Sequence, residues 1–131
     1  MKKILSFSVL TFLLSLASLG CARSSLLPVH DQVLVYPLPY DLTFLRTIEA
    51  IQAHSEWDLD WTDKEKGIIS IRNMRYSSFA DADRRQAILI VKRLNAHETS
   101  VQFDTKSQAV VGGDEILSLI RGQLSSETSR R

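Results

Sequence analysis

The chain has 131 residues, of which 16 are Lys or Arg, 15 are Asp or Glu and 44% are hydrophobic, so its size and composition suit one small globular domain. Its single cysteine has no intrachain partner, which excludes a scaffold held together by disulfides. The nearly balanced charge also excludes a basic nucleic-acid-binding tail and an acidic disordered chain.

The first twenty residues form an export pattern. Lys2 and Lys3 are their only charged side chains, and a run of sixteen mostly apolar residues, 4–19, follows. This is the layout of a secretory signal peptide. A membrane anchor is the alternative, but sixteen helical residues span only about 24 Å, short of the roughly 30 Å hydrocarbon core. We therefore predict that residues 1–20 are a signal peptide.

The end of this segment, Ser18-Leu19-Gly20-Cys21, resembles the lipobox of bacterial lipoproteins. It departs from the family pattern in having Ser18 where leucine is usual, three residues before the cysteine. The resemblance implies that Cys21 becomes the N-terminus and carries a diacylglyceryl group and an amide-linked acyl chain such as palmitate. The alternative is an unmodified thiol near an ordinary cleavage site. Ala22 stands where an aspartate favours inner-membrane retention, so the resemblance points to the outer membrane.

Two or more acyl chains give a lasting anchor. The expected location is therefore the outer membrane, facing the periplasm, with the bilayer bound through acylated Cys21. Removing the signal leaves 14 basic and 15 acidic side chains, a net charge of −1, so we expect no nucleic-acid partner. Residues 21–32 are predicted to be a lipidated tether, 33–124 a single domain and 125–131 a polar tail.

The first half of the domain predicts a strand, a helix and a second strand. Residues 33–36 are β-prone and are followed by prolines, which indicates an edge strand or an extended lead-in. Asp41 is a plausible N-cap for a helix over 42–54. Along one face of this helix we expect Leu42, Leu45, Ile48 and either Ile51 or Gln52.

Strict alternation over 57–61 predicts a strand with Trp57, Leu59 and Trp61 on one face and the intervening aspartates in water. A charged turn, 63–67, joins it to a strand over 68–74 in a hairpin.

The second half predicts two more strands and a helix. Residues 86–94 form a strongly apolar strand, and 99–103 alternate again. Gly112-Gly113 then breaks the chain, and Asp114 and Glu115 suit the start of a helix. The apolar side chains of this helix are Ile116, Leu117, Leu119, Ile120 and Leu124.

These elements predict an α+β fold, an antiparallel β-meander of three to five strands with two helices packed on one face, in β-α-β-β-β-β-α order. The order resembles the small domains of the BamC family of outer-membrane assembly lipoproteins. Other short lipoproteins share a D-K-E-x-G-x-I pattern, present here as Asp63-Lys64-Glu65-Lys66-Gly67-Ile68-Ile69. The resemblance implies fold more than function.

The acidic side chains of 58–65 are the first place to seek metal or acid–base chemistry. The calcium-loop pattern fails, because Thr62, Asp63 and Ile69 occupy positions that require other residues. The simpler interpretation is the solvated side of a strand and its turn. The three histidines have no second ligand at zinc spacing, so we expect no metal and no cofactor.

The segment 75–85 has the composition of an interaction surface, since aromatic side chains and arginines anchor interfaces. In the alternative, Phe79 covers the end of the sheet and Asp81 and Asp83 pair with the arginines. The residues of the possible surface are Arg75, Tyr76, Phe79, Arg84 and Arg85.

Two function hypotheses follow. The first is a membrane-anchored envelope lipoprotein, a non-catalytic accessory or binding module with a protein partner in an outer-membrane or periplasmic complex. It depends on the lipobox and on the lack of any catalytic motif. The alternative is a small periplasmic hydrolase that uses Asp58, Asp60 or Asp63.

Overall fold

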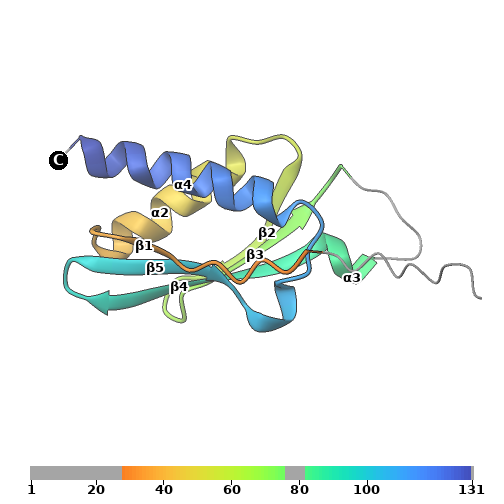
Figure 1. Cartoon of the computed structure of the whole chain (residues 1–131), viewed down its shortest axis with the longest axis horizontal. Coiled ribbons are helices and arrows are strands. Elements are labelled where there is room, and N and C mark those ends of the chain that lie inside the picture. Colours follow the sequence, from red (N-terminus) through yellow and green to blue (C-terminus); the bar gives the residue numbers. More distant parts are fainter. Residues whose placement is uncertain (1–27, 76–81, 131) are drawn as a thin grey trace, which may run out of the picture.

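The computed structural model describes residues 28–75 and 82–130, and it contains a five-stranded antiparallel sheet with its two long helices on one face (Figure 1). This confirms the α+β fold and the predicted order of the elements. The spatial order is β1-β5-β4-β3-β2, so the last four strands form a meander and the first adds beside β5. The strands are β1 (Leu34–Tyr36), β2 (Trp57–Asp63), β3 (Ile68–Asn73), β4 (Gln86–Asn95) and β5 (Glu98–Phe103).

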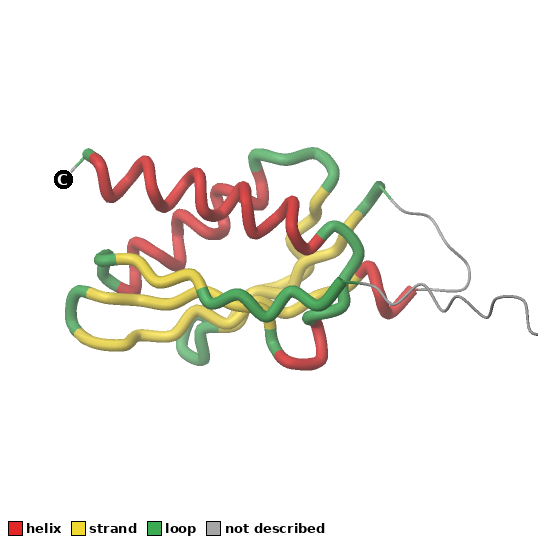
Figure 2. The backbone as a smooth tube through the Cα atoms, in the orientation of Figure 1, coloured by secondary structure: helices red, strands yellow, loops and turns green. Residues whose placement is uncertain are grey.

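The helical layer consists of α2 and α4, which pack against each other and against the same sheet face (Figure 2). The helices are α2 (Tyr40–Gln52), the short α3 (Ala82–Arg85) and α4 (Gly113–Ser129), with a 3-10 turn, η2, at Thr105–Ser107. The segment predicted as a polar tail, 125–131, therefore continues α4 as far as Ser129. An ion pair of 3.1 Å between Glu127 and Arg46 of α2 holds these last turns against the domain.

The core lies between the sheet and the helices. Alternate residues of each strand point into it, as period-two geometry requires. Fully buried side chains come from both layers, and they include Ile69, Ile71, Leu89, Val101 and Phe103 of the sheet and Ile51, Ile116, Ile120 and Leu124 of the helices.

Helix α2 differs from the expectation in its start and in its buried face. It begins at Tyr40 with Pro39 as N-cap, so Asp41 lies in the first turn and does not cap the helix. Proline fits there because a helix start needs no N–H from it. Of the predicted apolar stripe, Ile51 is fully buried and Leu42 and Ile48 are partly buried against the core, whereas Leu45 is half-exposed. The buried residues of α2 are Thr43, Phe44, Thr47, Ala50 and Ile51.

Strand β2 contains an irregularity that the alternating pattern hides. Leu59 pairs with Ile71, but Trp61 pairs with Ser70, so Asp60 is an extra residue in the strand. Trp57 is buried among the helices as expected, whereas Trp61 lies on the opposite sheet face and is half-exposed. The prediction that both tryptophans share one face is therefore wrong, because a bulge shifts the alternation by one residue.

Gly67 and Gly122 differ in the space around them, so replacing each with alanine tests the packing near Gly67. Gly67 has φ of 69°, and a Cβ there would lie 2.1 Å from the carbonyl oxygen of Val91. Its own carbonyl accepts a hydrogen bond of 2.8 Å from the Val91 N–H. Gly122 lies inside α4, and a Cβ there meets nothing within 4 Å.

Gly67→Ala should lower the free energy of unfolding by at least about 1–2 kcal/mol, because the left-handed backbone and the β4 carbonyl both oppose a side chain. Gly122→Ala should raise it by about 0.5–1 kcal/mol, since alanine favours the helix. Urea unfolding of both variants measures the difference. Equal stabilities would contradict the close approach of Gly67 to β4.

Candidate functional site

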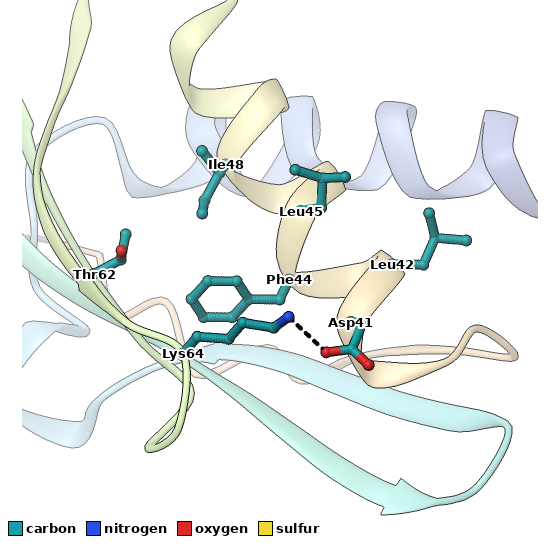
Figure 3. Close-up of a pocket in the computed structure, with 7 residues that line it drawn as sticks. All are labelled: Asp41, Leu42, Phe44, Leu45, Ile48, Thr62 and Lys64. Carbon is teal, nitrogen blue, oxygen red and sulfur yellow. Dashed lines mark ion pairs between the residues drawn. The ribbon is translucent and has the colours of Figure 1, made fainter.

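The candidate site is a groove between α2 and β2, with a cavity volume of about 560 Å³ (Figure 3). Its wall on one side is helix, and on the other side it is the end of the β2 strand. The groove is lined by Asp41, Leu42, Phe44, Leu45, Ile48, Thr62 and Lys64.

The helical wall is apolar. Leu42, Leu45 and Ile48 recur every three residues along α2, so they follow one side of the helix over nearly two turns. Phe44 is buried and lies below them against the core. Leu45 keeps 50% of its surface exposed. Leu42 and Ile48 are partly buried against the core, so Leu45 is the apolar side chain of this wall that is most open to solvent among the described residues.

The opposite wall exists because of the β2 bulge. After the extra residue, Thr62 pairs with the buried Ile69 and faces the helices, while Trp61 points to the other side of the sheet. In a regular strand Trp61 would occupy the helix-facing position next to α2. The bulge therefore replaces a large indole by a small threonine in the groove.

A charged pair lies at one end of the groove. Lys64 Nζ is 2.8 Å from Asp41 Oδ1, and the lysine holds the pKa of this carboxyl below its usual range. The Tyr40 hydroxyl donates to the Lys64 carbonyl, which ties the turn after β2 to the start of α2. The guanidinium of Arg93 stacks 5.3 Å above the Tyr40 ring, and burial raises the pKa of this phenol.

The predicted acidic group lies at the edge of the sheet, outside the groove. Asp60 is 3.2 Å from Arg72 and accepts a 3.1 Å hydrogen bond from Gln86. Asp63 accepts from the Lys66 N–H and pairs with its side chain, so its pKa is lowered. Asp58 is exposed and opposite Arg72 in the register. Asp58 is thus solvated as the simpler interpretation expects, whereas the Asp60 side chain is only 15% exposed.

The predicted interaction surface is only partly described. Tyr76 and Phe79 lie outside the described residues, as does Cys21. Arg75 is exposed and pairs with Glu56 at 3.4 Å. Arg84 and Arg85 end the short helix α3, next to β4.

The described part of the chain contains neither a cluster of metal-ligating side chains nor a membrane-crossing helix. Residues 28–75 and 82–130 contain no group of three His, Cys, Asp or Glu side chains placed to hold a metal ion. None of the helices in these ranges is long and apolar enough to cross a bilayer.

The sequence predicted an apolar stripe along α2 but not that Leu45 in this stripe would remain half-exposed beside a groove. The available signal was that α2 carries more apolar side chains than one face can bury. Its second stripe consists of Thr43, Thr47, Ala50 and Ile51, and it is this stripe that is buried.

Comparison with known proteins gives no relatives: no family model matches the chain, and no curated protein is similar to it.

Acid should weaken the fold through the aspartates beside the groove. The pKa values of Asp41 and Asp63 are lowered in the folded protein, so their stabilising contribution is full well above about pH 3.9, the unfolded value, and is lost as the pH falls through the folded values. Urea unfolding between pH 7 and 3 should show a smaller loss for the double variant Asp41→Asn, Asp63→Asn than for the wild type. If the free energy of unfolding fell equally with pH in both proteins, the stabilising role of these two aspartates would be contradicted.

Proposed function

We propose that the protein is a membrane-anchored envelope lipoprotein that serves as a non-catalytic binding module in an outer-membrane or periplasmic complex. In this proposal the groove between α2 and β2 receives the protein partner. The anchor is supported by the export pattern that ends at Cys21, and the binding role is supported by the open apolar groove.

The observation that carries the binding role is the apolar wall of α2, in which Leu45 is half-exposed between the partly buried Leu42 and Ile48. Ligand sites are commonly cavities of about 300–1,000 Å³ that are mostly apolar with a few polar groups. The groove has this volume and this character, with the Asp41–Lys64 pair as its polar end. Exposed clusters of large apolar side chains are characteristic of interaction sites.

The length and the lining of the groove indicate which kind of partner segment would fit it. The stretch from Leu42 to Ile48 rises about 9 Å along the helix axis. This length suits two or three apolar side chains from a partner segment, and the partner's polar groups can meet Asp41 and Lys64 at the end. The occupant is therefore a protein segment with a short apolar cluster beside a polar residue.

The hydrolase alternative has less support. A general acid needs a raised pKa, whereas the pKa of Asp63 is lowered by Lys66. Asp60 is engaged by Arg72 and Gln86. These contacts suit ion pairs that stabilise the strand edge.

A photo-reactive amino acid at position 45 should form a defined crosslink to an envelope protein in intact cells. The matched control is position 118, which is exposed on α4 and away from the groove. Leu45→Glu should abolish recovery of the same partner, while Ser118→Glu should retain it. Because Leu45 is half-exposed and Ser118 is exposed, both variants should remain folded, which circular dichroism can check. Equal crosslinking at the two positions would contradict a partner in the groove.

The anchor is tested separately. Mass spectrometry of protein extracted from membranes should find an N-terminus at Cys21 that carries acyl mass. Cys21→Ser should remove this mass and release the protein from the membrane fraction. A mature protein that begins after Cys21 and carries no acyl group would refute the anchoring.

A further inference from the structure

We propose that the end of the domain from which the tether leaves rests on the bilayer surface, with Val29 and Met74 entering the lipid headgroup region. This inference rests on the proposed anchoring at Cys21. We call this region the tether-exit end, and it consists of Val29, His30, Met74, Arg75 and the turn Val111–Gly113.

His30 fixes the point at which the tether leaves. Although it falls within the predicted tether, only 4% of its surface is exposed. Its N–H donates to the Gln108 carbonyl at 2.8 Å, and its Nδ1 lies 2.9 Å from a carboxylate oxygen of Asp114. A Cβ at Gly113 would lie 2.2 Å from the imidazole ring, so only glycine leaves room for it. The chain is therefore clamped onto the start of α4 from residue 30 onward.

The clamp shortens the free tether. Six residues, 22–27, separate Cys21 from Pro28, the first described residue. Fully extended, the stretch from Cys21 to Pro28 reaches about 25 Å. Strand β4 alone, with ten residues, is about 33 Å long. The tether is thus shorter than the long dimension of the sheet, which keeps the tether-exit end close to the lipid anchor.

Two exposed apolar side chains lie at this end. Val29 is 62% exposed and Met74 is 54% exposed. They flank the same turn, because Asn73, next to Met74, donates to the Val111 carbonyl at 3.0 Å while His30 packs on Gly113. Small apolar side chains beside a lipid anchor add buried area at the boundary between headgroups and acyl chains.

The charges at this end are of both signs. Arg75 pairs with Glu56, and Asp114 lies against His30. Asp31 is exposed nearby in the sequence, and Arg84, also exposed, lies at this end because its carbonyl accepts a hydrogen bond of 2.9 Å from the Val111 N–H. With no excess of one sign, the contact should be apolar and should respond little to salt, unlike binding through a polybasic patch.

This orientation turns the opposite end of the domain away from the membrane. Strand β1 leads from the tether-exit end to the start of α2, which lies at the far end together with the turn between β4 and β5 (Figure 1). The part of α2 that borders the groove follows directly, so the groove is presented to partners on the side remote from the bilayer.

Fluorescence quenching can test the orientation. Lipidation occupies the thiol of Cys21, so an introduced cysteine is the only thiol of the mature lipidated protein. Met74→Cys and, as the control at the far turn, Ala96→Cys are labelled with a fluorophore. Both proteins are reconstituted in vesicles of phosphatidylethanolamine and phosphatidylglycerol that contain nitroxide-labelled lipid. We expect several-fold stronger quenching of the label at position 74, unchanged in 0.5 M salt. Equal quenching, or stronger quenching at position 96, would overturn the proposal.

Further variants test the residues that the proposal invokes. In the Met74→Cys background, Val29→Asp should reduce the quenching, whereas Val33→Asp, an exposed valine farther along the same segment, should not. His30→Ala should also reduce it, because the free tether then lengthens. Since Val29 is exposed, its variant remains informative if His30→Ala unfolds. Quenching that is unaffected by Val29→Asp would refute the apolar contact.

Failure of the anchoring is distinguishable from failure of the orientation. If the wild-type protein reacts with a thiol reagent or lacks acyl mass, the proposed function fails. If it is acylated and membrane-bound but both labels are quenched alike, only the orientation fails.

Discussion

A single additional residue in β2 determines what this fold presents to solvent. Asp60 occupies the bulge, where Arg72 and Gln86 hold its carboxylate on the sheet. Because side chains alternate across a strand, one inserted residue exchanges the two faces for everything that follows. Trp61 leaves the helical side and Thr62 takes its place. The groove beside α2, and the half-exposed indole behind it, are two results of the same insertion.

Helix α2 shows how a single layer of helices distributes apolar side chains. Only one stripe of the helix can face the sheet and α4, and small residues such as Thr43, Thr47 and Ala50 occupy it. Both threonine hydroxyls donate to the backbone carbonyl four residues earlier: Thr47 donates to Thr43, and Thr43 donates to Pro39. The larger Leu45 is left at the surface. The same helix therefore packs closely inside the domain through small side chains and borders the groove with larger ones.

Local patterns in the sequence were enough to predict the strands, the helices and their arrangement in two layers, because alternation and helical spacing are short-range signals. These local patterns did not predict the features that depend on residues distant in the sequence. The bulge depends on partners in β3 and β4, and the choice of the buried stripe of α2 depends on α4. His30 is buried because Gly113, far along the chain, lacks a side chain. The groove combines two of these effects, so the sequence named its residues but could not place them together.

The position of β1 determines the order in which the fold can be completed. The four strands of the meander are joined to their neighbours in sequence, so each can pair as soon as the next one is present. Strand β1 instead pairs with β5, and Leu38, just after it, accepts a hydrogen bond from Thr99, 61 residues later. Contacts so distant in sequence form after local ones, because closing the intervening loop costs entropy. Pairing of β1 therefore waits until β5 is present, although β1 precedes all four strands of the meander in the chain.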